Sequence, residues 1–493
     1  MEGSSRSGEA FRILNDVYQA YFKEKGATPS LSLVLDYGNT LARIVKSSKY
    51  SVGALQLLQG IIKSEIELSG KHYPLERLES FAEISKASES GVQGTFLAVR
   101  AFTDIYSELT GQALDEDRFN LLVEIAKSSE YWTFGSSSAL REVVKISALD
   151  SDLTKQPISI DRLNTLAEIS KKAGKENFVV FKSIHNLSSL YAKLHNRPIP
   201  NDLVMEYGVA LSEAYSFRST ERIVNVDELV NLYVEVKQGL PPVDFISKYF
   251  PVLDKIAKSI RHTVCSLDGI FSNNIFSTLV GIAESYAEHT KEFIPSELLE
   301  EYGRILSRVP RHWEDSCGLN DSQAIQKFFK GVSDLERLHS KQALECIPTE
   351  VLDAYVDIIT RTPGDKQEQL NILKILEQTL NAYYKKEKEV VPLKFLKVLS
   401  QICQKTEFTY AVFSMVENLL FKPRESLSSL DELFENLHKF LSKDALGRIR
   451  YYNNNIRGNS EIATIEDVNQ ALKLLIEKLE NIPLNKLTPL VVA

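Results

Sequence analysis

The sequence predicts an all-α protein built from helical hairpins repeated in tandem. A short phrase, one apolar residue followed by Pro or a small polar residue, recurs nine times, and apolar positions at helical spacing follow it. Successive phrases lie 41 to 53 residues apart, which leaves room for two helices and two turns. A helical pair of this size cannot bury its own apolar stripe, so neighbouring pairs must stack into one continuous core.

The phrase marks the start of the first helix in each pair. Its second residue is Pro29, Pro74, Asp115, Ser159, Pro200, Pro242, Pro295, Pro348 or Pro392. Proline suits a helix start because its ring presets φ and its missing N–H is not needed there. Asp and Ser also favour a helix start, because their side chains accept hydrogen bonds from the free N–H groups of the first helical turn.

An apolar anchor follows each phrase at a fixed distance, seven residues after its second member and eight in the first copy. The anchors are Tyr37, Phe81, Leu122, Leu166, Tyr207, Tyr249, Tyr302, Tyr355 and Leu399. Apolar residues tend to recur three and four positions to either side, which places them on one helical stripe. The tyrosines of this column suggest either a stacking surface for bases or core packing. We predict core packing, with the hydroxyls reaching its edge.

The second helix of the pair is also visible. Apolar spacing predicts helices over 96–109, 178–194, 275–289 and 370–384, and short polar breaks over 68–72, 109–113 and 194–198 end several of them. A period of 40 to 47 residues resembles HEAT or armadillo arrays and is too long for tetratricopeptide or ankyrin repeats. The sequence therefore predicts a HEAT/armadillo-like helical array of about nine units, with atypical capping helices at both ends.

Breaks in the rhythm predict the domain organisation. The segments are an N-terminal capping helix over 1–28, regular repeats over 29–241, longer repeats with insertions over 242–347, regular repeats over 348–425, and a degenerate repeat, connector and capping helix over 426–493. Pro251 falls within the helix that starts near Pro242, where proline kinks or splits a helix. We therefore expect a bend near residues 240–255.

Composition is ordinary for a folded protein in water, with 43% hydrophobic and 25% charged residues. No apolar run is long enough to cross a membrane, and the polar N-terminus lacks a secretion signal. The four cysteines show no pairing pattern, which favours free thiols in a reducing cytoplasm. The net charge of −8, with Lys and Arg spread among acids, argues against nucleic acid as the main partner.

The sequence contains none of the common catalytic or metal-binding motifs: it has no phosphate-binding loop, no H-E-x-x-H and no paired C-x-x-C. His262 and Cys265 share a helix face but have no further metal ligands nearby. Asp150 and Asp152 resemble the start of a calcium loop but lack its glycine and terminal glutamate, so we predict a turn and cap there. His185 is predicted to be a satisfied or surface histidine. We expect no enzyme activity, no metal and no cofactor.

The longer repeats contain a segment without helical periodicity, 307–321, which gathers Arg308, Arg311, His312 and Trp313. One interpretation is an anchoring loop in which the tryptophan and the basic residues contact a partner. The other, which we favour, is an ordinary loop with the tryptophan packed on the core and the charges solvated.

The second such segment, 447–460, mixes arginines with aromatic residues, among them Arg448, Arg450, Tyr451 and Tyr452. Arginine and aromatic side chains together can clamp single-stranded nucleic acid. A flexible polar connector before a last capping helix explains the composition equally, since terminal repeats are atypical.

Nine units without a catalytic constellation favour a non-enzymatic scaffold or adaptor that binds another protein along an extended surface. The alternative is an RNA- or DNA-binding array that uses residues 447–460. A third hypothesis is an enzyme whose active site is assembled around residues 307–321. Helical-repeat arrays perform many functions, so the predicted fold does not discriminate among these three hypotheses.

Overall fold

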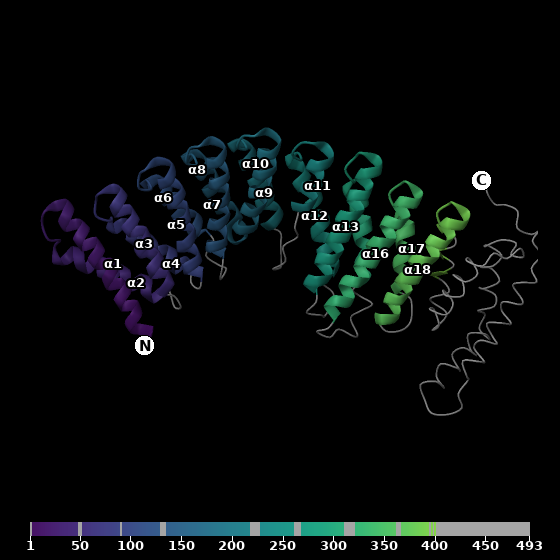
Figure 1. Ribbon diagram of the computed structural model, residues 1–493, viewed down its shortest axis with the longest axis horizontal. Coiled ribbons are helices and arrows are strands. Elements are labelled where there is room, and N and C mark those ends of the chain that lie inside the picture. The colour runs from purple at the N-terminus through teal and green to yellow at the C-terminus, as the bar shows by residue number, and fades with distance from the viewer. Residues whose placement is uncertain are drawn as a thin grey trace, which may run out of the picture. The chain divides into compact units, whose positions relative to one another are not determined.

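The computed structural model describes residues 2–47, 52–88, 91–128, 135–216, 227–260, 268–309, 321–360, 366–393, 396–397 and 399–400. Within these residues all regular secondary structure is helical, and the helices alternate between two layers, A and B (Figure 1). The A helices, which the phrases begin, are α2 (Leu31–Ser47), α4 (Leu75–Ser88), α6 (Glu116–Lys127), α8 (Ile160–Ala173), α10 (Asn201–Ser216), α12 (Val243–Ile260), α14 (Ser296–Leu306) and α17 (Thr349–Thr360). The B helices are α1 (Glu2–Lys25), α3 (Val52–Ser69), α5 (Val92–Thr110), α7 (Gly135–Thr154), α9 (Asn177–His195), α11 (Asp227–Lys237), α13 (Asp268–Thr290), α16 (Asp321–Ala343) and α18 (Lys366–Glu387).

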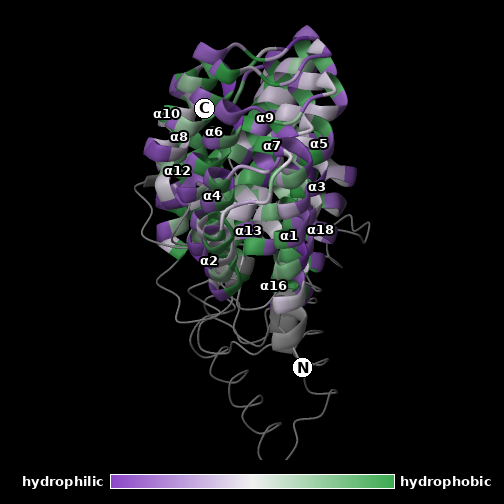
Figure 2. Cartoon of the chain, turned by 90° about the vertical axis from the view of Figure 1, so that its left-hand side faces the viewer, coloured by the Kyte–Doolittle hydropathy of each residue, from purple (hydrophilic) through white to green (hydrophobic). Residues whose placement is uncertain are grey.

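Contacts divide the chain into two compact parts, Met1–Pro251 and Val252–Ala493. In the first, A helices pack on A helices from α2 to α10 and B helices on B helices from α1 to α11; Figure 2 shows α4, α6, α8 and α10 on one side and α3, α5, α7 and α9 on the other. In the second, α14 packs on α17, and α13, α16 and α18 follow one another. The predicted array of helical hairpins is confirmed.

The division falls at Pro251, inside α12, and the helix continues across it. Of the two effects predicted for this proline, a split of the helix does not occur, and a kink stays a prediction. The expected bend near 240–255 stays a prediction. The predicted boundaries after residue 400 lie outside the described residues.

One turn recurs wherever a B helix gives way to the next A helix. The first residue after each B helix adopts a left-handed conformation, with φ between 50° and 69°; these residues are Gly26, Gly70, Gly111, Lys155, Asn196, Gln238, Lys291, Leu344 and Lys388. At each of these residues the main-chain N–H donates to the carbonyl four residues earlier, which closes the helix end. The residue that caps the next A helix follows four positions later every time. Because this offset is constant, the sequences of the repeats can be aligned on their left-handed residues.

The phrase lies at the cap of the A helix. Asp115 and Ser159 have extended backbones, and their side chains accept from the N–H groups of Arg118 and Arg162, as the capping prediction requires. Pro295 occupies the same cap position, with φ −61° and ψ 143°, one residue before the first helical position. In the first repeat the cap is Ser30, whose Oγ accepts from the Leu33 N–H, and this accounts for the extra residue in that interval.

All nine anchors are buried, with at most 6% of any side chain exposed, so the core prediction is confirmed. The expectation that the tyrosine hydroxyls reach the edge of the core is wrong. Tyr37 donates to the main-chain carbonyl of Tyr73 at 2.5 Å, and Tyr302 donates to that of Ile347. Each acceptor is the apolar residue of the next repeat's phrase. A buried carbonyl needs a partner, and the preceding A helix supplies it.

Three repeats have Phe or Leu at the anchor and place arginine four residues earlier. Arg77 Nη2 donates to the Leu114 carbonyl at 2.5 Å, Arg118 Nε to that of Ile158 at 3.1 Å, and Arg162 Nη2 to that of Ile199. The acceptor position is the same as for the tyrosines. Tyrosine at the anchor and arginine four residues earlier are thus alternative donors to one carbonyl.

Each arginine donor has a counter-charge: Arg118 pairs with the cap residue Asp115, and the other two pair with a carboxylate of the B helix. Arg77 Nη1 donates to Glu65 Oε2 at 2.6 Å, and Arg162 Nε donates to Asp150 Oδ2 at 3.0 Å. Both carboxylates lie twelve residues before their arginine and are buried. Asp150 and Asp152 were predicted to form a turn and cap, but both lie inside α7, where Asp150 is buried in its ion pair with Arg162.

Candidate binding groove between α13 and α16

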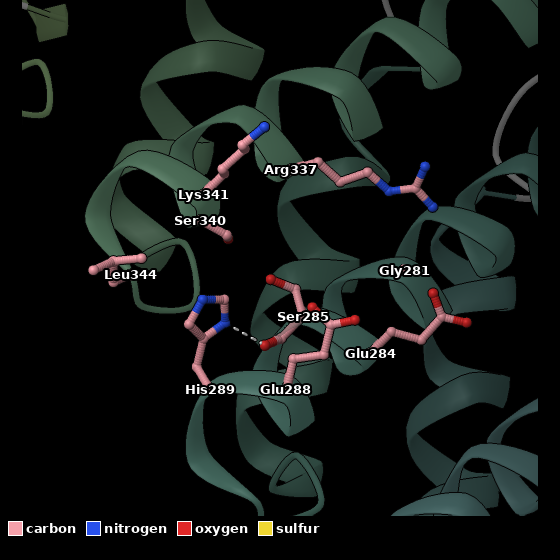
Figure 3. A pocket seen from close by; sticks show the side chains of 9 residues that line it. All are labelled: Gly281, Glu284, Ser285, Glu288, His289, Arg337, Ser340, Lys341 and Leu344. Carbon is pink, nitrogen blue, oxygen red and sulfur yellow. Dashed lines mark hydrogen bonds between the residues drawn. The ribbon is translucent and has the colours of Figure 1, made fainter. Parts of the chain in front are cut away.

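A groove of about 490 Å³ lies between two consecutive B helices of the C-terminal part, α13 and α16 (Figure 3). Its lining residues recur at helical spacing along both helices, so each helix contributes one stripe. They are Gly281, Glu284, Ser285, Glu288 and His289 on α13, and Arg337, Ser340, Lys341 and Leu344 on α16 and the turn after it. The groove therefore crosses a junction between two repeats.

One end of the groove lies at Gly281, which has no side chain. Gly60 on α3 occupies the same repeat position as Gly281, ten residues before the left-handed turn residue. A Cβ at Gly60 would lie 3.0 Å from Arg100 Nη1 on the next B helix, whereas a Cβ at Gly281 meets nothing within 4 Å. The residue equivalent to Arg100 is Ser333 on α16, which is too short to cover Gly281 and contacts Thr278 at 3.3 Å.

The two walls carry opposite charges. Arg337 and Lys341 extend from α16, four residues apart on one helical face, while Glu284 and Glu288 extend from α13 (Figure 3). Among the described residues neither Arg337 nor Lys341 has an acidic oxygen within 4.0 Å. Both cations are therefore available to a ligand in the groove.

A buried carboxyl lies behind the serines that line the groove. Glu336 is 1% exposed, and its Oε1 accepts from Ser340 Oγ at 2.9 Å. Burial raises the pKa of Glu336, and the smaller effects of hydrogen bonds from Ser340 and Ser285 and of the nearby Arg337 charge act in the opposite direction. Because both serines contact Glu336, the floor of the groove is tied to the core beneath it.

His289 closes one end of the groove. Its Nδ1 lies 2.7 Å from the main-chain carbonyl of Ser285, which can only accept, so Nδ1 carries the proton (Figure 3). The other ring nitrogen, Nε2, is left to face a ligand as an acceptor in the neutral ring or as a donor in the charged one.

The serine and the histidine of the groove are both engaged by other groups. The hydroxyl of Ser340 donates to a carboxyl and the His289 ring donates to a main-chain carbonyl, so neither makes the serine–imidazole contact of a nucleophilic site. In the described part of the chain, no three His, Cys, Asp or Glu side chains converge as metal ligands. What the groove offers is charge of both signs and hydrogen-bonding groups at fixed positions.

Of the residues proposed from sequence, the structure describes Arg308, which does not line the groove. Arg308, just after α14, binds α17 through its guanidinium: Nη1 donates to Asp357 Oδ1 at 3.2 Å, and Nη2 contacts Asp353. This arginine thus joins two A helices of successive repeats. The other seven candidates, Arg311, His312, Trp313, Arg448, Arg450, Tyr451 and Tyr452, lie outside the described residues, and their role stays a prediction.

The histidine assigned from sequence as satisfied or exposed has a charged partner. His185 Nδ1 on α9 lies 3.4 Å from Glu142 Oε2 on α7. Lys145 Nζ lies 2.7 Å from the other oxygen of Glu142. The hydrogen bonds and charges of His185 and Lys145 outweigh burial and lower the pKa of Glu142. These contacts form a polar link between successive B helices.

Sequence reasoning missed the groove, although one signal pointed to it. Counted back eight residues from the turn residue, the B helices from α3 to α18 carry Ile62, Thr103, Ser147, Ser188, Val230, Ala283, Glu336 and Leu380. Glu336 is the one ionisable side chain in that buried column. A buried carboxyl out of pattern marks a candidate site, but the column appears only when the repeats are aligned on their left-handed residues.

Comparison with protein-family models finds no match, and comparison with curated proteins finds no similar sequence. Among the described residues, no helix combines the length and apolar character needed to cross a bilayer. The class of protein that the fold defines is an α-helical repeat array.

Proposed function

We propose that the protein is a non-enzymatic helical-repeat scaffold that binds another protein along its B layer, with the groove between α13 and α16 as a point of contact. The observation that carries this proposal is the pair Arg337 and Lys341 on one wall of an open groove, two cations that have no ion-pair partner among the described residues. Opposite them stands the exposed carboxylate of Glu288.

The chemistry of the walls indicates the kind of ligand. An extended polypeptide offers main-chain donors and acceptors to Ser340 and His289, an acidic side chain to the cationic wall, and a basic one to Glu288. Charges at the rim of an interface steer association and select the partner more than they add affinity. A partner segment of mixed charge therefore fits this groove best.

The test compares proteins captured from the native cell by the full chain and by two groove variants. Ser333→Arg should fill the hollow, because arginine fills the equivalent space at Gly60. Arg337→Glu with Lys341→Glu reverses one wall. Lys193→Glu, an exposed lysine near the end of α9, is the control for charge change alone.

We expect a protein that binds the wild type and the Lys193 variant but is lost, at least tenfold, from both groove variants. A partner retained equally by all four chains would refute the groove as its contact. Binding of single-stranded RNA or DNA that weakens steeply between low and moderate salt would instead support the nucleic-acid alternative.

A further inference from the structure

Two side chains on the α13 side of the groove offer hydrogen-bond acceptors to a ligand. The Glu288 carboxylate is exposed and has no ion-pair partner among the described residues, and an ionised carboxylate can only accept. His289 adds a second acceptor. Its Nδ1 proton is committed to the Ser285 carbonyl, so the neutral ring accepts at Nε2. These two side chains therefore present lone pairs to the groove and no protons.

The floor of the groove has the same polarity. Ser340 Oγ donates its one proton to Glu336 Oε1 at 2.9 Å, and Ser285 also hydrogen-bonds this carboxyl. A serine hydroxyl that has donated its proton keeps only lone pairs for another partner. Both serines line the groove and are at most 7% exposed, so the carboxyl beneath them sets their orientation. With Glu336 ionised, both serine hydroxyls accept from a ligand and donate nothing to it.

Charge favours a cationic ligand at this place. Glu336 is buried, so water and salt screen its charge much less than that of an exposed group. Burial raises the pKa of Glu336, and a cation held above the serines lowers it again, so the ligand and the ionised carboxyl stabilise each other. The cations of α16 oppose this less, because Arg337 and Lys341 are exposed and the Lys341 side chain extends away from the α13 residues (Figure 3).

Building on the groove contact of the proposed function, we propose that the groove holds the guanidinium of an arginine from the partner protein. The acceptor set that receives it consists of the Glu288 carboxylate, His289 Nε2 and the hydroxyl oxygens of Ser285 and Ser340. A guanidinium carries five N–H donors in a planar fork, whereas an ammonium group carries three on one atom. Acceptors spread over two facing helices suit the broader donor. An acid in the same partner segment can then pair with the cationic wall.

The experiment measures the affinity of a blocked peptide for the full-length chain by isothermal titration calorimetry near pH 7.5, where histidine is mostly neutral. The probe peptide contains glycine, one aspartate and one arginine. The control peptide has citrulline in place of arginine, which keeps the shape of the side chain without its charge. Glu288→Gln and Glu336→Gln remove negative charge from the site at nearly constant volume. Glu235→Gln is the matched control, since Glu235 is exposed and occupies on α11 the repeat position of Glu288.

We expect the arginine peptide to bind the wild type and the Glu235 variant equally. It should bind both site variants about tenfold or more weakly, as expected when hydrogen bonds to a charged group are lost. The citrulline peptide should bind the wild type weakly and lose little more in the site variants. Equal affinity of the wild type for the two peptides overturns the proposal, as does the absence of measurable binding of the arginine peptide.

Capture from the native cell separates the arginine contact from the groove contact. A partner that is lost with Ser333→Arg but retained by Glu288→Gln and Glu336→Gln uses the groove without an arginine in it, which overturns the acceptor set alone. Conversely, if the arginine peptide binds as expected but no partner protein is captured, the acceptor set stands and the scaffold function is overturned.

Discussion

The hydroxyl of Tyr302 donates a hydrogen bond to the main-chain carbonyl of Ile347, the residue that opens the next repeat's phrase. The bond is buried, and it crosses the junction between two repeats. It explains why the anchor is tyrosine in several repeats whose surroundings are otherwise apolar. Successive repeats are therefore joined by a directed polar contact as well as by apolar packing.

Loss of this hydroxyl should destabilise the C-terminal part. Tyr302→Phe keeps the ring but removes the hydroxyl donor of the buried Ile347 carbonyl, which leaves it only the 3.9 Å contact from Cys346 Sγ, at a cost of about 1–3 kcal/mol. Tyr302→Ala removes the ring too and should cost about 3–5 kcal/mol. Chemical denaturation measures both. Tyr384→Phe on α18, where the tyrosine is half-buried, is the control and should change the unfolding free energy by less than about 0.5 kcal/mol. Equal effects of the two Phe variants would contradict the assignment.

The left-handed turn residues predict stabilising substitutions. Lys155 has φ 58°, a conformation that strains a residue with a Cβ and that glycine adopts freely. Lys155→Gly should raise the free energy of unfolding by about 0.5–1 kcal/mol, after the greater flexibility of glycine in the unfolded chain is counted. The reciprocal change Gly111→Ala, at φ 69°, should lower it by about 1 kcal/mol. If both substitutions change the free energy of unfolding in the same direction, the left-handed backbone conformation does not determine stability at these positions.

The glycine that follows some anchors predicts a pair of opposite effects. A Cβ on Gly208 would overlap the side chain of Ile169 on the preceding A helix, whereas a Cβ on Gly38, at the same repeat position, meets nothing within 4 Å. Gly208→Ala should therefore cost about 1–3 kcal/mol through overpacking. Gly38→Ala should stabilise by about 0.5–1 kcal/mol because alanine is the better helix former. Thermal unfolding of the two variants checks the contrast.

The buried Glu336 predicts a pH dependence. Burial raises the pKa of its carboxyl in the folded state above the ordinary value of 4.5. A carboxyl of this kind contributes its full stability below the unfolded pKa and loses it as pH rises through the folded pKa. Glu336→Gln cannot ionise, so its melting temperature should exceed that of the wild type at pH 8, and the difference should shrink towards pH 4.5. Glu288→Gln, an exposed groove residue, should show no such trend. A gap that widens on acidification would rule out the buried charge as its cause.

Sequence alone could predict the two-layer helical array because spacing and apolar stripes belong to the backbone pattern. The buried anchors followed from the same pattern. The hydrogen-bond donors to the carbonyls could not be predicted in this way. In the sequence Arg77 looks like a surface cation, and only the structure shows that it and Tyr37 donate to the carbonyl at the same repeat position. The groove escaped prediction for a related reason. The groove includes Gly281, and only the packed structure shows that no neighbouring side chain covers this glycine.

The central claim is that tyrosine at the anchor and arginine four residues earlier are alternative donors to one carbonyl. It is tested most directly in the second repeat, in a Glu65→Gln background so that no buried carboxylate loses its cation. Arg77→Leu there should cost about 1–3 kcal/mol, because the Leu114 carbonyl is left unpaired. Adding Phe81→Tyr should restore about 1 kcal/mol or more by supplying a hydroxyl where Tyr37 has one. The same Phe81→Tyr change with Arg77 present should destabilise, since two donors would compete for one acceptor. Denaturation showing that Phe81→Tyr has the same effect with and without Arg77 would contradict the account.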